Sequence, residues 1–192
     1  FDDLLSNAMA TMQQNRTHIA MLCLDVDKFH EINDSVDLAT GDAVLREVGN
    51  RIRSALRTGD FVARRSSDEF AVAIVDIDNL GEVVSFMDRL AEALRVPIRI
   101  ADKEFMCTMS AGIALAPNDG DTAPELLRHA DIALARAKAE GGQRMRFFEE
   151  SMDKALQRRH TVAQDLRLAL RREEFEVVYQ SQFDLATGEQ TG

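Results

Sequence analysis

The sequence lacks long hydrophobic runs and has only two cysteines, and these absences exclude several classes of protein. No stretch reaches the roughly 18 consecutive apolar residues of a membrane-spanning helix. The first residues also lack the basic start and apolar run of a signal peptide. Cys23 and Cys107 each lie in an apolar run, which is typical of buried thiols rather than of a disulfide or a metal site. We therefore expect a cytoplasmic chain, and we leave open a membrane anchor elsewhere in a longer parent protein.

Positive charge is also scarce. The 192 residues carry 23 Lys and Arg against 33 Asp and Glu, a formal net charge of −10. A protein that coats nucleic acid or anionic lipid is usually basic, so we expect neither nucleic acid nor a membrane as a partner of this chain. Hydrophobic residues make up 45% of the chain, enough for one buried core with an appendage. Because it starts at Phe1 and ends at Gly192, we expect an excerpt with a truncated N-terminus.

What the sequence does have is an alternation of strand-like and helix-like apolar patterns between residues 18 and 148. An almost continuous apolar run from His18 to Leu24 predicts a strand covered on both faces. The remaining patterns predict a helix over 41–58, a hairpin of strands 61–63 and 70–75, a helix over 80–94, a strand pair over 97–100 and 105–116, a helix over 122–140 and an edge strand over 144–148. This order, βαββαβ with an added hairpin and helix, predicts an α+β sandwich whose antiparallel or mixed sheet is layered with helices.

Acidic residues follow the first strand and occupy the hairpin tip. Asp25 and Asp27 end the strand, and Asp68 and Glu69 lie at the tip. If the two elements are neighbours in one sheet, three or four carboxylates converge, and hard oxygen ligands of this kind suit Mg²⁺. The other interpretation is that strand ends and turns are simply polar, and an Asp-x-Asp pair alone does not separate the two. Arg64 and Arg65 precede the tip; contact with a phosphate is one interpretation, but residues at a strand end are more often solvated, as we expect here.

Six short blocks along the chain resemble the successive blocks of a GGDEF domain, the diguanylate cyclase family. They are Leu24–Phe29, Ile32–Asp34, Gly41–Asp42, Arg57–Asp60, Ser66–Phe70 and Ala130–Lys138. The resemblance covers residues 1–148. It implies a ferredoxin-like fold related to the class III nucleotide cyclases, in which two GTP-loaded subunits meet as a homodimer and condense GTP to cyclic di-GMP. It also implies Mg²⁺ or Mn²⁺ with bound nucleotide, and otherwise no cofactor.

The resemblance further implies a role for each matching residue. The implied metal ligands are the carboxylates of Asp25, Asp68 and Glu69 and the carbonyl of Val26, and the implied catalytic pair is Asp68 and Glu69, with Glu69 helping to activate the 3′-hydroxyl. The implied substrate contacts are Asn33 and Asp42 to the guanine base, Lys138 to phosphate, and the turn residues Ser66 and Ser67. Arg57 and Asp60 match an inhibitory Arg-x-x-Asp site for cyclic di-GMP. Taken alone, such a pair is more often a surface ion pair.

The signature turn departs from the family pattern, because it reads Ser66-Ser67-Asp68-Glu69-Phe70 with serines in place of both glycines. Glycine lets the backbone approach a phosphate without a Cβ in the way. Three further places differ, since His30 replaces lysine, Asp37-Leu38 replaces Gly-His, and Gly142 replaces arginine. These changes remove positive charge or backbone freedom near the triphosphate, so we expect weak GTP binding from this degenerate form.

The tail has a different character. Residues 149–173 are charged and carry a helical apolar stripe, which predicts a connector helix. Residues 174–192 resemble the first strand and turn of an EAL phosphodiesterase domain, whose catalytic residues would lie past Gly192. In tandem proteins of this kind, a cyclase-like domain without activity often regulates the phosphodiesterase.

Three functions therefore stay open. The first is a regulatory domain, weak or inactive as a cyclase, that binds GTP or cyclic di-GMP and acts on a C-terminal EAL domain of the same chain. The second is an active diguanylate cyclase. The third is a dimerisation or docking module that binds no nucleotide.

Overall fold

The apolar run that starts at His18 forms the central strand of the molecule. The computed structural model describes residues 1–150, 169, 181, 187 and 190, and this strand is β1 (His18–Val26). Eight of its nine residues are buried. Such burial is expected of a strand that is covered on both faces and paired on both edges.

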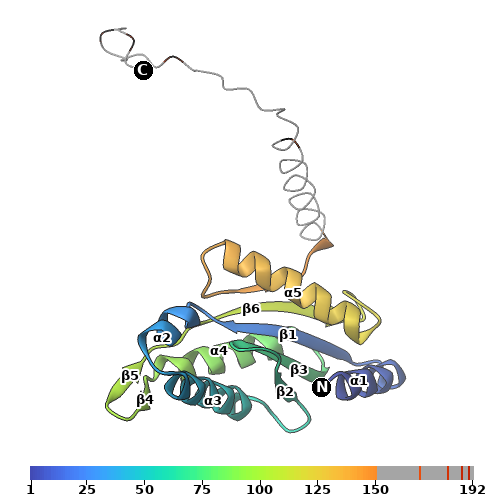
Figure 1. Cartoon of the computed structure of the whole chain (residues 1–192). Coiled ribbons are helices and arrows are strands. Elements are labelled where there is room, and N and C mark those ends of the chain that lie inside the picture. The colour runs from blue at the N-terminus through green and yellow to red at the C-terminus, as the bar shows by residue number, and fades with distance from the viewer. Residues whose placement is uncertain (151–168, 170–180, 182–186, 188–189, 191–192) are drawn as a thin grey trace. The chain divides into compact units, whose positions relative to one another are not determined.

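The main sheet has five strands in the order β2-β3-β1-β6-β7 (Figure 1). All neighbours pair antiparallel except β6 and β7, which run parallel. The other strands of this sheet are β2 (Phe61–Arg64), β3 (Glu69–Ile77), β6 (Met109–Ala116) and β7 (Met145–Phe147), while β4 (Ile98–Ile100) and β5 (Lys103–Phe105) form a separate hairpin. The predicted α+β class and mixed sheet are confirmed.

Helices cover both faces of the sheet (Figure 1). One face packs against α3 (Leu38–Ala55) and α4 (Gly81–Arg95), and the other against α1 (Asp2–Asn15) and α5 (Ala123–Ala139). Alternate residues of β1 divide between the two cores: Leu22 and Leu24 face α3 and α4, whereas Met21 and Cys23 face α1 and α5. The short helix α2 (Phe29–Ser35) contacts α3 and carries Phe29 into the first core. The cores therefore hold the ends of β1, β3 and α5 in fixed positions.

Three features of this fold differ from the sequence-based expectation. The helices α1 and α2 were not predicted, although Leu5, Met9 and Met12 of α1 recur at helical spacing and are buried. The strand predicted over 105–116 is two strands. Its first part, β5, pairs with β4, and its second part, β6, pairs with β1, so the chain changes sheets at 106–108. Local apolar patterning could not show this break, because both parts are β-like and only their partners differ.

The predicted connector over 149–173 and the predicted EAL segment over 174–192 lie almost entirely outside the described residues, and both stay predictions. The chain divides after Asp153 into two units, of which Phe1–Asp153 holds the sheet and its helices. Among the residues that the structure describes, no helix is long and apolar enough to cross a membrane.

Candidate functional site

The carboxylates expected to converge do so at one end of the central strands. Asp25 near the end of β1 lies opposite Glu69 at the start of β3, and the N–H of Val26 donates to the carbonyl of Asp68 at 3.1 Å. On the other side, Asp25 lies opposite Ser110 of β6. Antiparallel pairing thus brings together Asp25, Asp68 and Glu69, which are far apart in the sequence.

The electrostatics of this corner centre on Asp25, whose side chain is only 4% exposed. Burial raises the pKa of Asp25 above its ordinary value, and the negative charges of Asp68 and Glu69 add to the rise. Lys138, near the end of α5, opposes this rise because its Nζ forms an ion pair with Asp25 Oδ2. The phosphate-binding candidate and a metal-binding candidate are therefore paired with each other.

The signature turn is hydrogen-bonded to a neighbouring arginine, Arg64. Arg64 Nε donates to the carbonyl oxygens of Ser66 and Ser67 at 3.1 and 3.0 Å, and Arg64 Nη2 donates to the Ser67 carbonyl at 2.7 Å. The hydroxyl of Ser67 donates to Asp68 Oδ1 at 2.7 Å. A serine that replaces a family glycine thus uses the carboxylate expected to bind metal.

Arg65 links the same turn to α5. Its guanidinium donates to both carboxylate oxygens of Asp131 at 2.6 and 3.1 Å, and one nitrogen also lies 3.4 Å from Cys23 Sγ. The expectation that the two arginines before the tip are simply solvated is therefore corrected, although both remain partly exposed. The sequence signal that was overlooked is a pair of cations beside an acidic turn, which favours local bonds to the turn and to a nearby helix.

The two guanine-reading candidates lie together on α2 and α3. A Cβ at Gly41 would approach Asn33 Oδ1 to 2.7 Å, so the missing side chain lets Asn33 lie against α3 beside Asp42. Asp42 lines a cavity of about 460 Å³ between α3 and β2. It also lies 3.5 Å from Arg64 Nη2, so one arginine contacts both the signature turn and a candidate base-reading carboxylate.

Asp27 does not join the carboxylate group. It accepts hydrogen bonds from Thr108 Oγ1 at 2.9 Å, Ser110 Oγ at 2.5 Å and the N–H of Gln143 at 3.2 Å. Three carboxylates therefore converge rather than four, and Asp27 instead ties β1 to β6 and to the loop after α5. At Gly142 in this loop φ is +72°, and a Cβ would approach Asp27 Oδ1 to 2.9 Å. A side chain at this position would disturb that junction.

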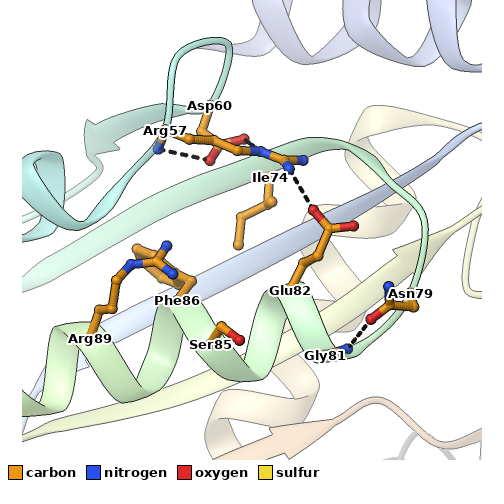
Figure 2. Close-up of a pocket in the computed structure, with 9 residues that line it drawn as sticks. All are labelled: Arg57, Asp60, Ile74, Asn79, Gly81, Glu82, Ser85, Phe86 and Arg89. Atoms are coloured by element: carbon orange, nitrogen blue, oxygen red, sulfur yellow. Dashed lines mark hydrogen bonds and ion pairs between the residues drawn. The ribbon is translucent and has the colours of Figure 1, made fainter.

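The Arg-x-x-Asp pair lines a second cavity, of about 390 Å³, between the loop before β2 and helix α4 (Figure 2). The carboxylate of Asp60 is 3% exposed and accepts from the backbone N–H groups of Arg57 and Val75, each at 3.2 Å. Its guanidinium partner, Arg57, contacts Glu82 Oε2 at 2.5 Å and the Val75 carbonyl at 2.6 Å. The expected pair is thus brought together. Asp60, however, already accepts backbone hydrogen bonds, and Arg57 already contacts Glu82 and the Val75 carbonyl.

The opposite side of this cavity is formed by α4. Phe86 lines it with a buried ring, and Ser85 and Arg89 lie on the same helix (Figure 2). Arg89 Nε and Nη2 donate to the carbonyl of Ala55 at 3.2 and 2.9 Å, so this arginine satisfies a carbonyl at the end of α3. The cavity therefore has an apolar wall, a guanidinium at each side and two carboxylates, the buried Asp60 and, at its edge, Glu82.

The oxygen donors at the first corner fit a hard divalent cation. They are the carboxylates of Asp25, Asp68 and Glu69 and the carbonyl of Val26, which are oxygen ligands that Mg²⁺ accepts. A cation there would also relieve the repulsion that helps to raise the pKa of Asp25. Among the described residues, however, no three His, Cys, Asp or Glu side chains are already arranged as a metal-binding group. The carboxylates would have to reorient to share one ion.

Comparison with known proteins agrees with this arrangement. The family profile described as diguanylate cyclase, GGDEF domain, matches residues 1–144. The chain is 37% identical over 171 residues to the cyclic di-GMP phosphodiesterase NbdA of Pseudomonas aeruginosa, covering 89% of this chain and 22% of that protein. The chain spans only 21–23% of the length of three such curated relatives.

Solved structures extend the likeness to three dimensions. The GGDEF domain of TpbB from Pseudomonas aeruginosa superimposes with a TM-score of 0.79 at 35% identity, covering 82% of this chain and 92% of that domain. The GGDEF domain of DgcB from Caulobacter crescentus, solved with cyclic di-GMP, gives a TM-score of 0.68 at 27% identity, covering 77% of this chain and 87% of that one.

Proposed function

The chain belongs to the GGDEF family of diguanylate cyclase domains and thus to cyclic di-GMP signalling, and from this premise we propose that it is a regulatory domain, weak or inactive as a cyclase, that binds GTP or cyclic di-GMP. In a longer parent protein it would act on a C-terminal EAL phosphodiesterase domain. That part of the proposal is supported by the resemblance of residues 174–192 and by the relative NbdA, which is a cyclic di-GMP phosphodiesterase.

One observation carries the proposal of weak activity, namely that two carboxylates needed for catalysis already have partners. Lys138 is ion-paired with Asp25, and the Ser67 hydroxyl bonds to Asp68. An ion or nucleotide that used these groups would compete with Lys138 for Asp25 Oδ2 and with the Ser67 hydroxyl for Asp68 Oδ1. With glycine at position 67 the second contact would not exist, so the serine both obstructs the backbone and occupies a ligand oxygen.

If the domain binds GTP with Mg²⁺, then Asp25, Asp68, Glu69 and the Val26 carbonyl would hold the ion. Bound Mg²⁺ would neutralise charge on the triphosphate and on the developing leaving group. The protein's own contribution would be to orient the base through Asn33 and Asp42 and to accept a proton from the 3′-hydroxyl at Glu69. Lys138, released from Asp25, would face the phosphates.

Turnover tests the proposal directly. The protein is incubated with GTP and Mg²⁺ at high protein concentration, and the products are separated by chromatography. We expect little or no cyclic di-GMP from the parent and more from the Ser66→Gly/Ser67→Gly double variant, because that change frees the turn and the Asp68 oxygen. Rapid formation of cyclic di-GMP by the parent would instead favour the alternative of an active cyclase.

Binding separates regulation from simple docking. Cyclic di-GMP and GTP are titrated by calorimetry into the parent and into Arg57→Ala, and cyclic di-GMP is also titrated into Arg53→Ala, a control that removes an exposed arginine outside the Arg57 cavity. We expect cyclic di-GMP binding that is lost in Arg57→Ala and kept in Arg53→Ala. Equal binding by all three would contradict the inhibitory-site assignment. Absence of binding for both nucleotides would favour a dimerisation or docking module.

A further inference from the structure

Glu82, in the first turn of α4, was not singled out by any sequence pattern, yet it reaches the guanidinium of the Arg-x-x-Asp pair. Its two oxygens have different partners. Oε1 accepts from the backbone N–H of Asp78 at 2.8 Å, and Oε2 accepts from Arg57 Nη1 at 2.5 Å. Figure 2 shows the carboxylate projecting from α4 toward Arg57 across the edge of the cavity. Glu82 therefore supplies the only carboxylate that approaches Arg57 from outside its own loop among the described residues.

The other partners of Arg57 are fixed by the fold. Arg57 Nη2 donates to the carbonyls of Val75 and Asp76 at 2.6 and 3.2 Å, and Nε lies 3.5 Å from Asp60 Oδ1. Two of these acceptors are backbone atoms of β3, and Asp60 is buried. The Glu82 side chain is 27% exposed and rotates about its own bonds, so it is the one contact that a ligand could displace without unfolding the strand.

A carboxylate and a phosphate compete for the same face of a guanidinium, because both offer two oxygens at a similar spacing. Hydrogen bonding to the Asp78 N–H, with the charge of Arg57, holds the pKa of Glu82 below its ordinary value, so the group is ionised at neutral pH. A phosphate that approached Arg57 would meet this negative charge before it met the guanidinium.

We propose that Glu82 is an intramolecular competitor that sets the affinity of Arg57 for phosphate, so that ligand binds at this cavity only when the Glu82 carboxylate moves away. The proposal rests on the proposed function, since it assumes a phosphate-bearing ligand at the Arg-x-x-Asp pair. It makes Glu82 a residue that determines affinity and not a ligand contact. It also makes the cavity a site whose strength depends on a side chain of α4.

The test uses Glu82→Gln, which removes the charge while keeping an oxygen for the Asp78 N–H. Its matched control is Glu92→Gln, the same change on the exposed face of α4, where Glu92 pairs with Arg95. Calorimetric titrations use two probes, cyclic di-GMP and inorganic pyrophosphate, against the parent, both single variants, Arg57→Ala, and Arg57→Ala/Glu82→Gln. Thermal unfolding of each variant confirms that it is folded.

We expect Glu82→Gln to bind both probes about two- to fivefold more tightly than the parent, the range of one partly exposed charge contact. Glu92→Gln should match the parent, and the gain should vanish when Arg57 is also replaced. Equal affinity of Glu82→Gln and the parent for both probes, including no binding by either, would overturn the competitor role. A gain that persists without Arg57 would overturn it as well.

The two probes keep this proposal distinct from the proposed function. If Arg57→Ala abolishes cyclic di-GMP binding while Glu82→Gln changes nothing, the inhibitory-site assignment stands and the competitor role is wrong. If the parent and Arg57→Ala bind cyclic di-GMP alike, that assignment is wrong. The competitor role is then decided by pyrophosphate alone: an Arg57-dependent gain in Glu82→Gln supports it, and no gain overturns it.

Discussion

Gly112 of β6 lies where the backbone of α5 packs directly on the backbone of the strand. Replacing this glycine with alanine should push α5 away from β6. A Cβ at this position would lie 2.1 Å from the carbonyl oxygen of Ala130 and 2.1 Å from the amide nitrogen of Leu134. Both are backbone atoms of α5, so no side chain can rotate to make room. The helix would have to retreat until these contacts reach at least 3.4 Å. Lys138, on the same helix, would then be drawn away from Asp25.

The size of the effect follows from the kind of atom that must move. Inserting a methyl group into a packed core typically costs about 1–3 kcal/mol when side chains can adjust. Because the helix backbone itself must shift here, we expect about 3 kcal/mol or more. At roughly 2–4 °C per kcal/mol for a domain of this size, the melting temperature should fall by about 6–12 °C.

Differential scanning calorimetry on Gly112→Ala and on Gly49→Ala measures this prediction with a control of the same chemistry. A Cβ at Gly49 in α3 would meet only the ring of Phe70, at 3.3 Å, and alanine gains up to about 1 kcal/mol over glycine inside a helix. We expect Gly49→Ala to be neutral or slightly stabilising. An unchanged melting temperature for Gly112→Ala, or equal shifts for both variants, would refute the reasoning about close packing.

Three further predictions concern ion pairs and hydrogen bonds that hold the elements together. Asp131→Ala breaks the two-point contact with Arg65, so the melting temperature should fall by about 2–4 °C, as for the loss of about 1 kcal/mol; no shift would mean that the pair adds nothing to stability. Arg51→Ala, but not Glu47→Ala, should lower the free energy of unfolding in urea by about 1–3 kcal/mol, because Arg51 donates to the carbonyls that end α4 and precede β4. The arginines at 146 and 136 hold the pKa of Glu140 below its ordinary value, so this carboxylate stabilises the fold above the ordinary glutamate pKa and loses that effect as the pH falls through the lowered one. Glu140→Gln should therefore be less stable than the parent at about pH 7 and equal to it at low pH, and a difference that is independent of pH would contradict this.

The carboxylate corner could be predicted because it depends on strand order. The apolar run before Asp25 predicts a central strand, and the polar tip at Asp68 and Glu69 predicts a hairpin, but the sequence brings their carboxylates together only if the two elements are neighbours in one sheet. The antiparallel pairing of β1 with β3 meets that condition. The family resemblance could be recognised from the sequence for a different reason, because the residues of the signature turn and of each other block are close together in the chain. Local apolar patterning was therefore sufficient to predict which residues end a strand or occupy a turn.

The contacts that control these groups could not be predicted in the same way. Glu82 meets Arg57 across 25 residues, and Arg65 meets Asp131 across 66, and each contact depends on where a helix begins or crosses the sheet. The division of 105–116 into β5 and β6 likewise depends on the choice of partner strand and not on composition. Side-chain bonds between elements are thus decided by tertiary packing, which a single sequence does not record.

The central position of β1 in the sheet affects how readily each of the two candidate sites opens to solvent. Amide hydrogens along β1 are paired to β3 on one edge and to β6 on the other, so they can exchange with solvent only when the sheet itself opens. The backbone of Asp25 belongs to this strand, so we expect its position to be lost only when the sheet opens, whereas Asp68 lies in the turn before β3. Arg57 lies in the loop before β2, a short edge strand, and its contact with the partly exposed Glu82 can be lost while the sheet stays intact. The proposed nucleotide and metal corner and the proposed ligand cavity therefore lie in regions that we expect to open with different cooperativity.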